Sequence, residues 1–179
     1  LGYNKPHEIK EHSLKKLLEQ WSVSRHLLPG LKVYQIHSAT FESGVLDNAE
    51  VLHQLYEIKK ETGLKIGISA SGERQSEIVD YASQIKIKNE PLFESFQVTY
   101  NILETSTHDI LERLIKTGRL VIIKEALANG RVFKNDDYTH YESLYADLER
   151  LSKKYKAPID AVALRFVIDH LQPGIVLSG

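Results

Sequence analysis

The chain has 179 residues, of which 42% are hydrophobic, 8% aromatic and 26% charged, and its formal net charge is −1. This composition is typical of a globular protein, and we expect residues 1–179 to form a single domain. The near-neutral charge leaves no basic excess to neutralise phosphates, so no nucleic-acid partner is expected. No apolar stretch reaches the roughly 18 residues of a membrane span, so no membrane partner is expected either.

The chain contains no cysteine. This excludes a disulfide framework and a thiolate nucleophile, and it is typical of proteins in a reducing compartment. The first residues have neither the basic start nor the apolar core of a signal peptide, so we expect a cytoplasmic location. Because the chain begins with leucine and contains no methionine, we expect it to be part of a longer polypeptide or to omit modified or disordered residues.

The hydrophobic pattern predicts a first helix at about residues 7–28 and then strands that alternate with amphipathic helices. The predicted strands cover residues 31–36, 64–69, 96–101, 120–125 and 174–179. The helices between them are expected at about residues 48–61, from about residue 73, and at 107–117. In the last of these, Thr107 is the expected N-cap and Gly118 the expected stop. This alternation indicates parallel βαβ units.

A histidine directly follows the first predicted strand. His37 comes after the apolar residues 31–36 and begins a polar loop. In α/β barrels the catalytic residues lie at the C-terminal ends of the strands, and an imidazole titrates near neutral pH. A strand-end histidine can equally be a structural residue held by hydrogen bonds, so the catalytic interpretation of His37 depends on the motifs around it.

Four motifs, in this order and spacing, resemble those of the aldo-keto reductase family. They are residues 34–40 (YQIHSAT), 67–72 (GISASG), 96–101 (FQVTYN) and 124–131 (KEALANGR). Residues 156–167 are similar to the last long helix of that family's barrel. Each motif alone is unspecific, and their order over almost the whole chain carries the resemblance. It implies an α/β fold, a (β/α)8 TIM barrel, of which this chain supplies strands four to eight and lacks the first three.

The resemblance implies an NADP(H)-dependent oxidoreductase that reduces the carbonyl of a small-molecule aldehyde or ketone to an alcohol by hydride transfer. The family's catalytic groups are an aspartate, a tyrosine, a lysine and a histidine, and only the histidine falls within this chain, at His37. There it would orient and polarise the carbonyl as negative charge develops on the oxygen. The choice of NADP over NAD rests on the resemblance alone.

The resemblance also implies a cofactor site made by strand ends. Ser69, Ser71 and Gln97 match positions that contact the nicotinamide carboxamide, and Ala70 stands where the family usually has an asparagine. Whether Ser71 replaces that asparagine is left open. Gln97 has the alternative role of an inward-pointing polar residue between barrel layers.

The motif at residues 124–131 departs most from the family pattern. Lys124 replaces the aromatic ring that stacks on the nicotinamide in many members, and its ammonium could instead pair with a cofactor phosphate or with Glu125. Leu127 and Asn129 belong to the loop that covers the pyrophosphate. Arg131 is interpreted either as a phosphate clamp or as a solvated loop charge.

These departures favour a second hypothesis, that of a catalytically inactive or truncated barrel of this family that binds a nucleotide or a partner. A third is another (β/α)8 enzyme with different chemistry, because a fold does not fix a function. No metal site is expected, since Glu8 and His12, one helical turn apart, provide too few ligands for zinc. We expect residues 133–141 to form a polar loop on the active-site face.

Overall fold

The computed structural model of the protein describes residues 11–178. Its helices are α1 (Leu14–Ser24), α2 (Ala49–Thr62), α3 (Gln75–Gln84), α4 (His108–Lys116), α5 (Glu142–Tyr155) and α6 (Ile159–Leu171). Its strands are β1 (Val33–Ile36), β2 (Lys65–Ser69), β3 (Lys86–Ile87), β4 (Glu90–Pro91), β5 (Phe93–Thr99), β6 (Leu120–Lys124) and β7 (Ile175–Val176). Short 3₁₀ turns lie at η1 (Arg25–Leu27), η2 (Val45–Asp47), η3 (Ala128–Gly130) and η4 (Asp136–Tyr141).

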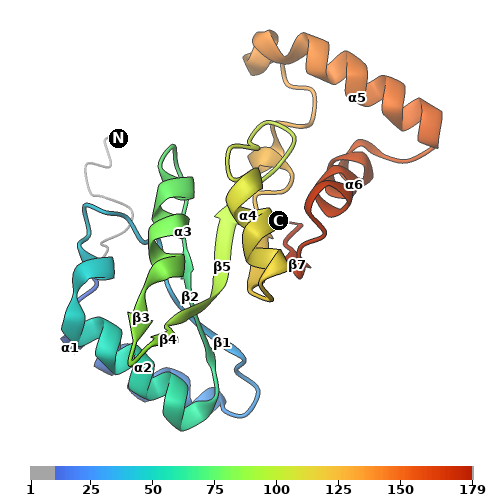
Figure 1. The fold of residues 1–179 in the computed structure, drawn as a ribbon. Coiled ribbons are helices and arrows are strands. Elements are labelled where there is room, and N and C mark those ends of the chain that lie inside the picture. The colour runs from blue at the N-terminus through green and yellow to red at the C-terminus, as the bar shows by residue number, and fades with distance from the viewer. Residues whose placement is uncertain (1–10, 179) are drawn as a thin grey trace.

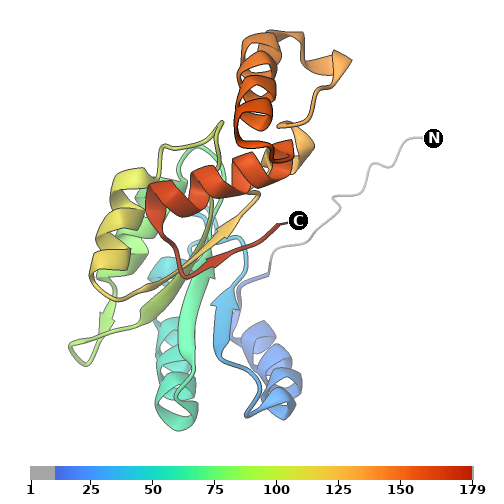
Figure 2. The same ribbon diagram turned by 90° about the vertical axis from the view of Figure 1, so that its right-hand side faces the viewer.

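Five strands form one parallel sheet in the order β1-β2-β5-β6-β7, which is also their order in the chain. The hairpin β3-β4 stands apart from this sheet. Helices α2, α3 and α4 follow β1, β2 and β5 and cover one face of the sheet (Figures 1 and 2). The predicted parallel βαβ units are therefore confirmed, and strands laid down in chain order are typical of a barrel wall.

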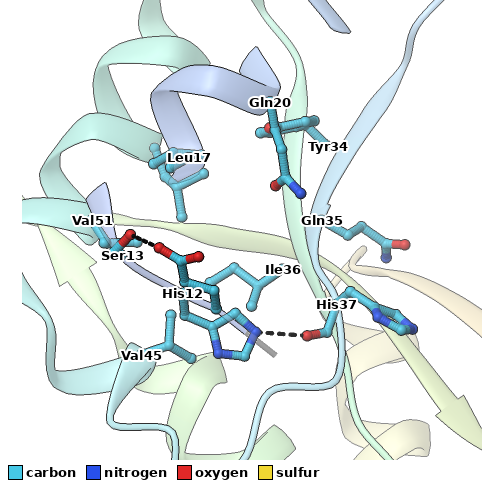
Figure 3. Close-up of a pocket in the computed structure, with 12 residues that line it drawn as sticks. His12, Ser13, Leu17, Gln20, Tyr34, Gln35, Ile36, His37, Val45 and Val51 are labelled. Carbon is cyan, nitrogen blue, oxygen red and sulfur yellow. Dashed lines mark hydrogen bonds between the residues drawn. The ribbon is translucent and has the colours of Figure 1, made fainter. Parts of the chain in front are cut away.

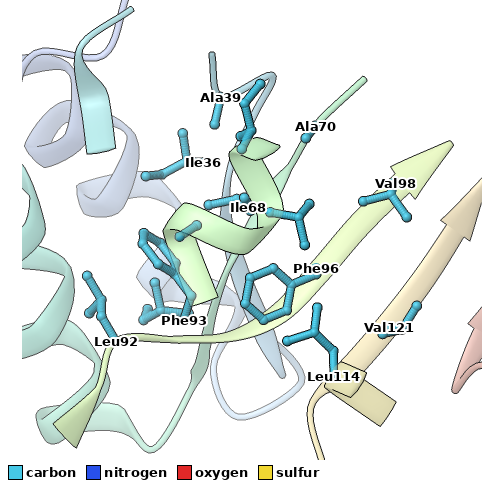
Figure 4. Packing of buried hydrophobic residues seen from close by; sticks show 14 of the residues in the cluster. Ile36, Ala39, Ile68, Ala70, Leu92, Phe93, Phe96, Val98, Leu114 and Val121 are labelled. Atoms are coloured by element: carbon cyan, nitrogen blue, oxygen red, sulfur yellow. The ribbon is translucent and has the colours of Figure 1, made fainter. Parts of the chain in front are cut away.

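The two faces of the sheet differ in polarity because successive side chains of a strand point to opposite sides. The helix-covered face is apolar and contributes Ile36, Ile68, Phe96 and Val98 to the main core, where Leu114 of α4 packs with them (Figure 4). Each such buried side chain contributes about 1.5–3 kcal/mol to folding. The opposite face carries the polar side chains of the predicted site, and we call it the inner face.

The first helix is shorter than predicted. It begins at Leu14, because the Ser13 hydroxyl accepts a hydrogen bond from the backbone N–H of Lys16 at 3.2 Å and caps the helix there. Residues 11–13 are not helical, and residues 7–10 of the prediction lie outside the described part. The chain leaves the helix through η1 before Pro29, a residue that cannot continue a helix.

Other boundaries moved by a few residues. Strand β5 begins three residues before the prediction, and the hairpin β3-β4 was not predicted. Thr107 precedes α4, but its hydroxyl makes no capping bond, whereas Gly118 ends that helix with a left-handed φ of 77° as expected. Residues 133–141 contain the turn η4 rather than only loop. Within residues 11–178, none of the helices has the length and apolar character that crossing a membrane requires.

Candidate active site at the strand ends

The predicted site residues all lie at the C-terminal edge of the sheet or in the loops that leave it. They are placed as follows: His37 after β1, Ser69 at the end of β2, Ser71 after it, Gln97 in β5, Lys124 at the end of β6, and Leu127 and Asn129 in the next loop. Parallel pairing continues past the strand ends. The Ala39 N–H donates to the Ser69 carbonyl at 2.8 Å, and the Ala70 N–H donates to the Gln97 carbonyl at 2.9 Å.

Strand register brings three of these residues into one row on the inner face. Ser69 is the register partner of Gln97, and His37 lies one residue beyond the pair formed by Ile36 and Ile68. Side chains of paired residues in a parallel sheet point to the same side, so His37, Ser69 and Gln97 are neighbours. The next register pair, Thr99 with Lys124, lies farther toward the loops.

The backbone of His37 is held from the side opposite to its ring. His12 Nε2 donates to the His37 carbonyl at 2.9 Å, and Figure 3 shows the His37 imidazole pointing away from His12, on the same side of the strand as Gln35. A carbonyl only accepts, so Nε2 of His12 carries the proton. The helical position predicted for His12 is wrong, because His12 precedes α1, while Glu8 lies outside the described residues.

The two serines at the end of β2 differ in exposure and in the hydrogen bonds they can offer to a ligand. Ser69 is only 3% exposed, and its Oγ accepts the Ser38 N–H at 2.9 Å, which fastens the loop after β1 and leaves the hydroxyl proton for donation. Ala70 is fully buried on the apolar face (Figure 4), so the residue at this position presents no polar group to the inner face. Ser71 is exposed at the mouth of a cavity.

This cavity has a volume of about 270 Å³ and opens between the ends of β2, β5 and β6. It is lined by Ser71, Gly72, Gln75, Thr99, Asn101, Leu103, Glu104, Glu125, Arg131 and Tyr141. The half-buried Arg131 is fixed by its Nε, which donates to the Ala128 carbonyl at 2.8 Å. Arg131 is therefore ordered at the cavity wall rather than being a fully solvated charge.

The loop after β6 has an unusual backbone. Glu125, Ala128 and Asn129 have φ values of 55°, 51° and 53°, a region that residues other than glycine seldom adopt. Asn101 holds the start of this loop, because its Nδ2 donates to the Glu125 carbonyl at 2.9 Å while its Oδ1 accepts the Leu103 N–H at 2.9 Å. Backbone strain of this kind persists where the surroundings enforce it, which is common at ligand sites.

Lys124 does not pair with Glu125. It is half-buried, and its ammonium makes no hydrogen bond or ion pair with any residue in the described range 11–178. One of the two roles predicted for this lysine is thus absent, and contact with a bound anion stays as the prediction. A cation at the end of β6, in register with Thr99 of the cavity wall, favours an acidic ligand.

Two polar residues that support the site were not among the predicted ones. Gln75 is 1% exposed, and its side-chain amide makes two bonds of 3.1 Å, accepting the Thr99 N–H and donating to the Thr99 carbonyl. It thereby continues the hydrogen-bond ladder of β5 where β2 has ended. Asn101, the second, belongs to the motif at residues 96–101 and could have been proposed from it, whereas nothing near Gln75 in the sequence distinguishes it.

Comparison with known proteins decides the family. A model of the aldo/keto reductase family matches residues 4–179. The chain belongs to this family. The match confirms the resemblance seen in the sequence and the predicted class of fold, a barrel of parallel strands of which this chain contains a part.

Solved structures agree with this assignment. An aldo-keto reductase from Bacillus halodurans in its holo form is 20% identical, with a TM-score of 0.62, and the match covers 93% of this chain and 57% of that one. The apo form gives 20% identity, a TM-score of 0.62, and coverages of 90% and 55%. A Pseudomonas aeruginosa chain assigned to the same family is 17% identical, with a TM-score of 0.50, and the match covers 76% of this chain and 49% of that one. No curated protein gave a significant match. The chain thus spans about half the length of these aldo-keto reductases.

Proposed function

We propose that the polypeptide to which this chain belongs is an NADP(H)-dependent reductase that converts an aldehyde or ketone to an alcohol. The observation that carries the proposal is the row formed by His37, Ser69 and Gln97 on the inner face of a sheet of this family. Three hydrogen-bonding side chains side by side at strand ends suit the recognition of a carbonyl and an amide.

The residues at the strand ends fit a nicotinamide cofactor. Ser69 has a hydroxyl proton to donate, and the half-buried amide of Gln97 both donates and accepts, as a carboxamide partner must. Arg131, which lines the cavity, and Asn129 in the same loop would give a pyrophosphate a cationic and an amide donor, and Leu127 of this loop packs in a small apolar cluster. When bound, the dihydronicotinamide supplies the hydride.

His37 acts on the carbonyl in this proposal. As hydride reaches the carbonyl carbon, negative charge grows on the oxygen, and a hydrogen bond from the imidazole stabilises it. The His12 bond to the His37 carbonyl fixes the backbone and leaves the ring on the inner face. Ser71 supplies a further donor for the carboxamide, because buried Ala70 cannot. The ammonium of Lys124 approaches a cofactor phosphate.

A second candidate is a barrel of this family that binds a nucleotide or a partner without turnover. The observation that favours it is that Lys124 and Ala70 stand at two cofactor-contact positions without the ring or the amide that would hold a nicotinamide firmly. In this case the cavity binds the nucleotide, but the ring is not positioned for transfer.

The test is an assay of the full-length protein with NADPH, NADH and a panel of small aldehydes and ketones, followed at the absorbance of the reduced nicotinamide. We expect NADPH oxidation, and we expect His37→Ala to lower kcat about a hundredfold with little change in the Kd for NADPH. The matched control is His53→Ala, since His53 is an exposed histidine of α2 that, among residues 11–178, bonds only to the Ala49 carbonyl. Turnover unchanged by His37→Ala would remove this residue from the mechanism. Tight NADPH binding with no oxidation across the panel would establish the second candidate instead.

A further inference from the structure

A second polar cluster lies on the opposite, helix-covered side of the sheet from the proposed active site. It consists of Tyr100, which follows β5, His108, the first residue of α4, and His170, near the end of α6. Tyr100 shares its face of the strand with Phe96 and Val98 and is fully buried, while His108 is half-buried and His170 is exposed. None of the three contributes to the reductase proposal.

The three polar atoms of this cluster converge on one point. The Tyr100 Oη lies 3.1 Å from His108 Nδ1 and 2.5 Å from His170 Nδ1. The two imidazole centroids are 4.5 Å apart. Phe166 stacks on Tyr100 at 6.4 Å with an angle of 11° between the rings, and its centroid is 5.0 Å from that of His170. The cluster therefore has an apolar wall on one side and an opening to solvent at His170.

The number of available protons limits how the phenol and the two imidazoles can hydrogen-bond. A phenol has one proton, so it can donate to only one imidazole, and the other Nδ1 must donate to the phenol oxygen. Two imidazole nitrogens and one phenol oxygen are thus held together by protons that a metal ion can replace. Imidazole nitrogen is a ligand that zinc and copper prefer.

We infer that Tyr100, His108 and His170 form a binding site for one divalent transition-metal ion, Zn²⁺ or Cu²⁺. With metal–ligand bonds of about 2.0–2.1 Å, the donors of a tetrahedral ion lie roughly 3.3 Å apart. The 3.1 Å separation at His108 is already close to this value. The shorter separation at His170 has to widen, which the exposed position of that ring allows. Three protein ligands leave a fourth position for water.

The binding step balances by the release of one proton. The phenol of Tyr100 gives its proton to solvent, the histidine whose Nδ1 carries a proton shifts to the other tautomer, and both Nδ1 lone pairs and the phenolate then bind the ion. The positive charge of the ion favours the phenolate over the phenol, which is why the proton leaves only when the ion binds. No electron transfer is involved.

Two carboxylates on the helices that carry these histidines are already paired. Glu112, one turn after His108, pairs with Lys116 at 2.9 Å, and Asp169 pairs with Arg165. In the described part of the chain, no three His, Cys, Asp or Glu side chains form a metal-binding group. The site we infer differs because its third ligand is a tyrosine. A bound ion would tie β5, α4 and α6 together and stabilise the fold by mass action.

The first test is a titration of the chelator-treated full-length protein with Zn²⁺ in competition with a chromogenic chelator. We expect one ion per chain, and we expect His170→Gln, which can still bond to the phenol, to weaken binding at least about tenfold. His53→Gln is the matched control and should bind like the wild type. Zn²⁺ in excess should raise Tm in the wild type and the control by more than in His170→Gln. Equal binding by the wild type and His170→Gln, or no binding at all, would overturn the inference.

The second test identifies the tyrosine ligand. Cu²⁺ bound to a phenolate gives a visible charge-transfer band, which we expect in the wild type and in His53→Gln. The band should be lost in Tyr100→Phe, whose folding is checked by circular dichroism. A band that persists in the folded Tyr100→Phe variant would exclude Tyr100 from the site. Neither test depends on the proposed reductase activity, because each reads metal binding directly.

Discussion

Replacing Gln75 by leucine tests whether a single side chain continues the sheet beyond the end of β2. The amide of Gln75 stands where a backbone peptide of a longer β2 would be, and it satisfies both the N–H and the carbonyl of Thr99 at 3.1 Å. A leucine fills much of the same volume but offers neither a donor nor an acceptor. Two buried backbone groups of Thr99 then lose their partner.

The magnitude follows from the two lost bonds. A buried backbone group without a partner costs about 1–3 kcal/mol, so two such groups cost about 2–6 kcal/mol. Burying an apolar leucine side chain in place of an amide stabilises the fold by about 1–2 kcal/mol and offsets part of this loss. We therefore expect the free energy of unfolding to fall by about 3 kcal/mol, which corresponds to a Tm lower by about 6–12 °C in a domain of 150–250 residues.

The assay is urea unfolding of the full-length protein, followed by circular dichroism and by Trp21 fluorescence. The expected result is a lower midpoint with an unchanged slope, which indicates a change in stability rather than in the denatured state. Gln84→Leu is the matched control, because Gln84 lies on the same helix, is exposed and, in the described part of the chain, bonds only to Asp80. Equal midpoints for Gln75→Leu and Gln84→Leu would refute the reasoning.

Three further predictions concern stability. Gly67→Ala places a Cβ 2.7 Å from the Ser95 carbonyl oxygen and should lower the free energy of unfolding by about 1–3 kcal/mol in urea; an unchanged midpoint would contradict this crowding. Asn48→Ala removes the Oδ1 that accepts the Val51 N–H at 3.2 Å and should cost about 1 kcal/mol, whereas Asn48→Asp should cost much less; equal losses would exclude a capping role. Burial raises the pKa of Tyr100 above its unfolded value of about 10, so its contribution to stability is complete below pH 10 and is lost as the pH rises further. Between pH 8 and pH 10.5 the urea midpoint should therefore fall less in Tyr100→Phe than in the wild type. An identical fall in the two proteins would disprove this dependence.

Local patterns in the sequence were sufficient for the five strands of the parallel sheet, for the helices α2, α3 and α4 and for the family, but they did not predict the hairpin β3-β4 or α5. Apolar runs at residues 31–36, 64–69 and 120–125 predict strands of a parallel sheet, because helices cover such a sheet and the side chains beneath them must be apolar. The sequence also located the predicted site at strand ends, since the carboxyl ends of parallel strands meet at one edge. The start of α1 was placed too early because the cap at Ser13 interrupts an otherwise helical pattern.

The sequence by itself determined which segments form the sheet and that His37, Ser69 and Gln97 end or approach the ends of its strands. Only the tertiary structure decided how other parts of the chain support them. His12 meets the His37 carbonyl across 25 positions, Gln75 meets Thr99 across 24, and His170 meets Tyr100 across 70. Periodicity reports whether a residue faces the core or solvent, but it carries no information about which distant partner will satisfy a polar group. The packing of the fold determines the partner, because buried donors and acceptors lose their hydrogen bonds to water and must bond to one another.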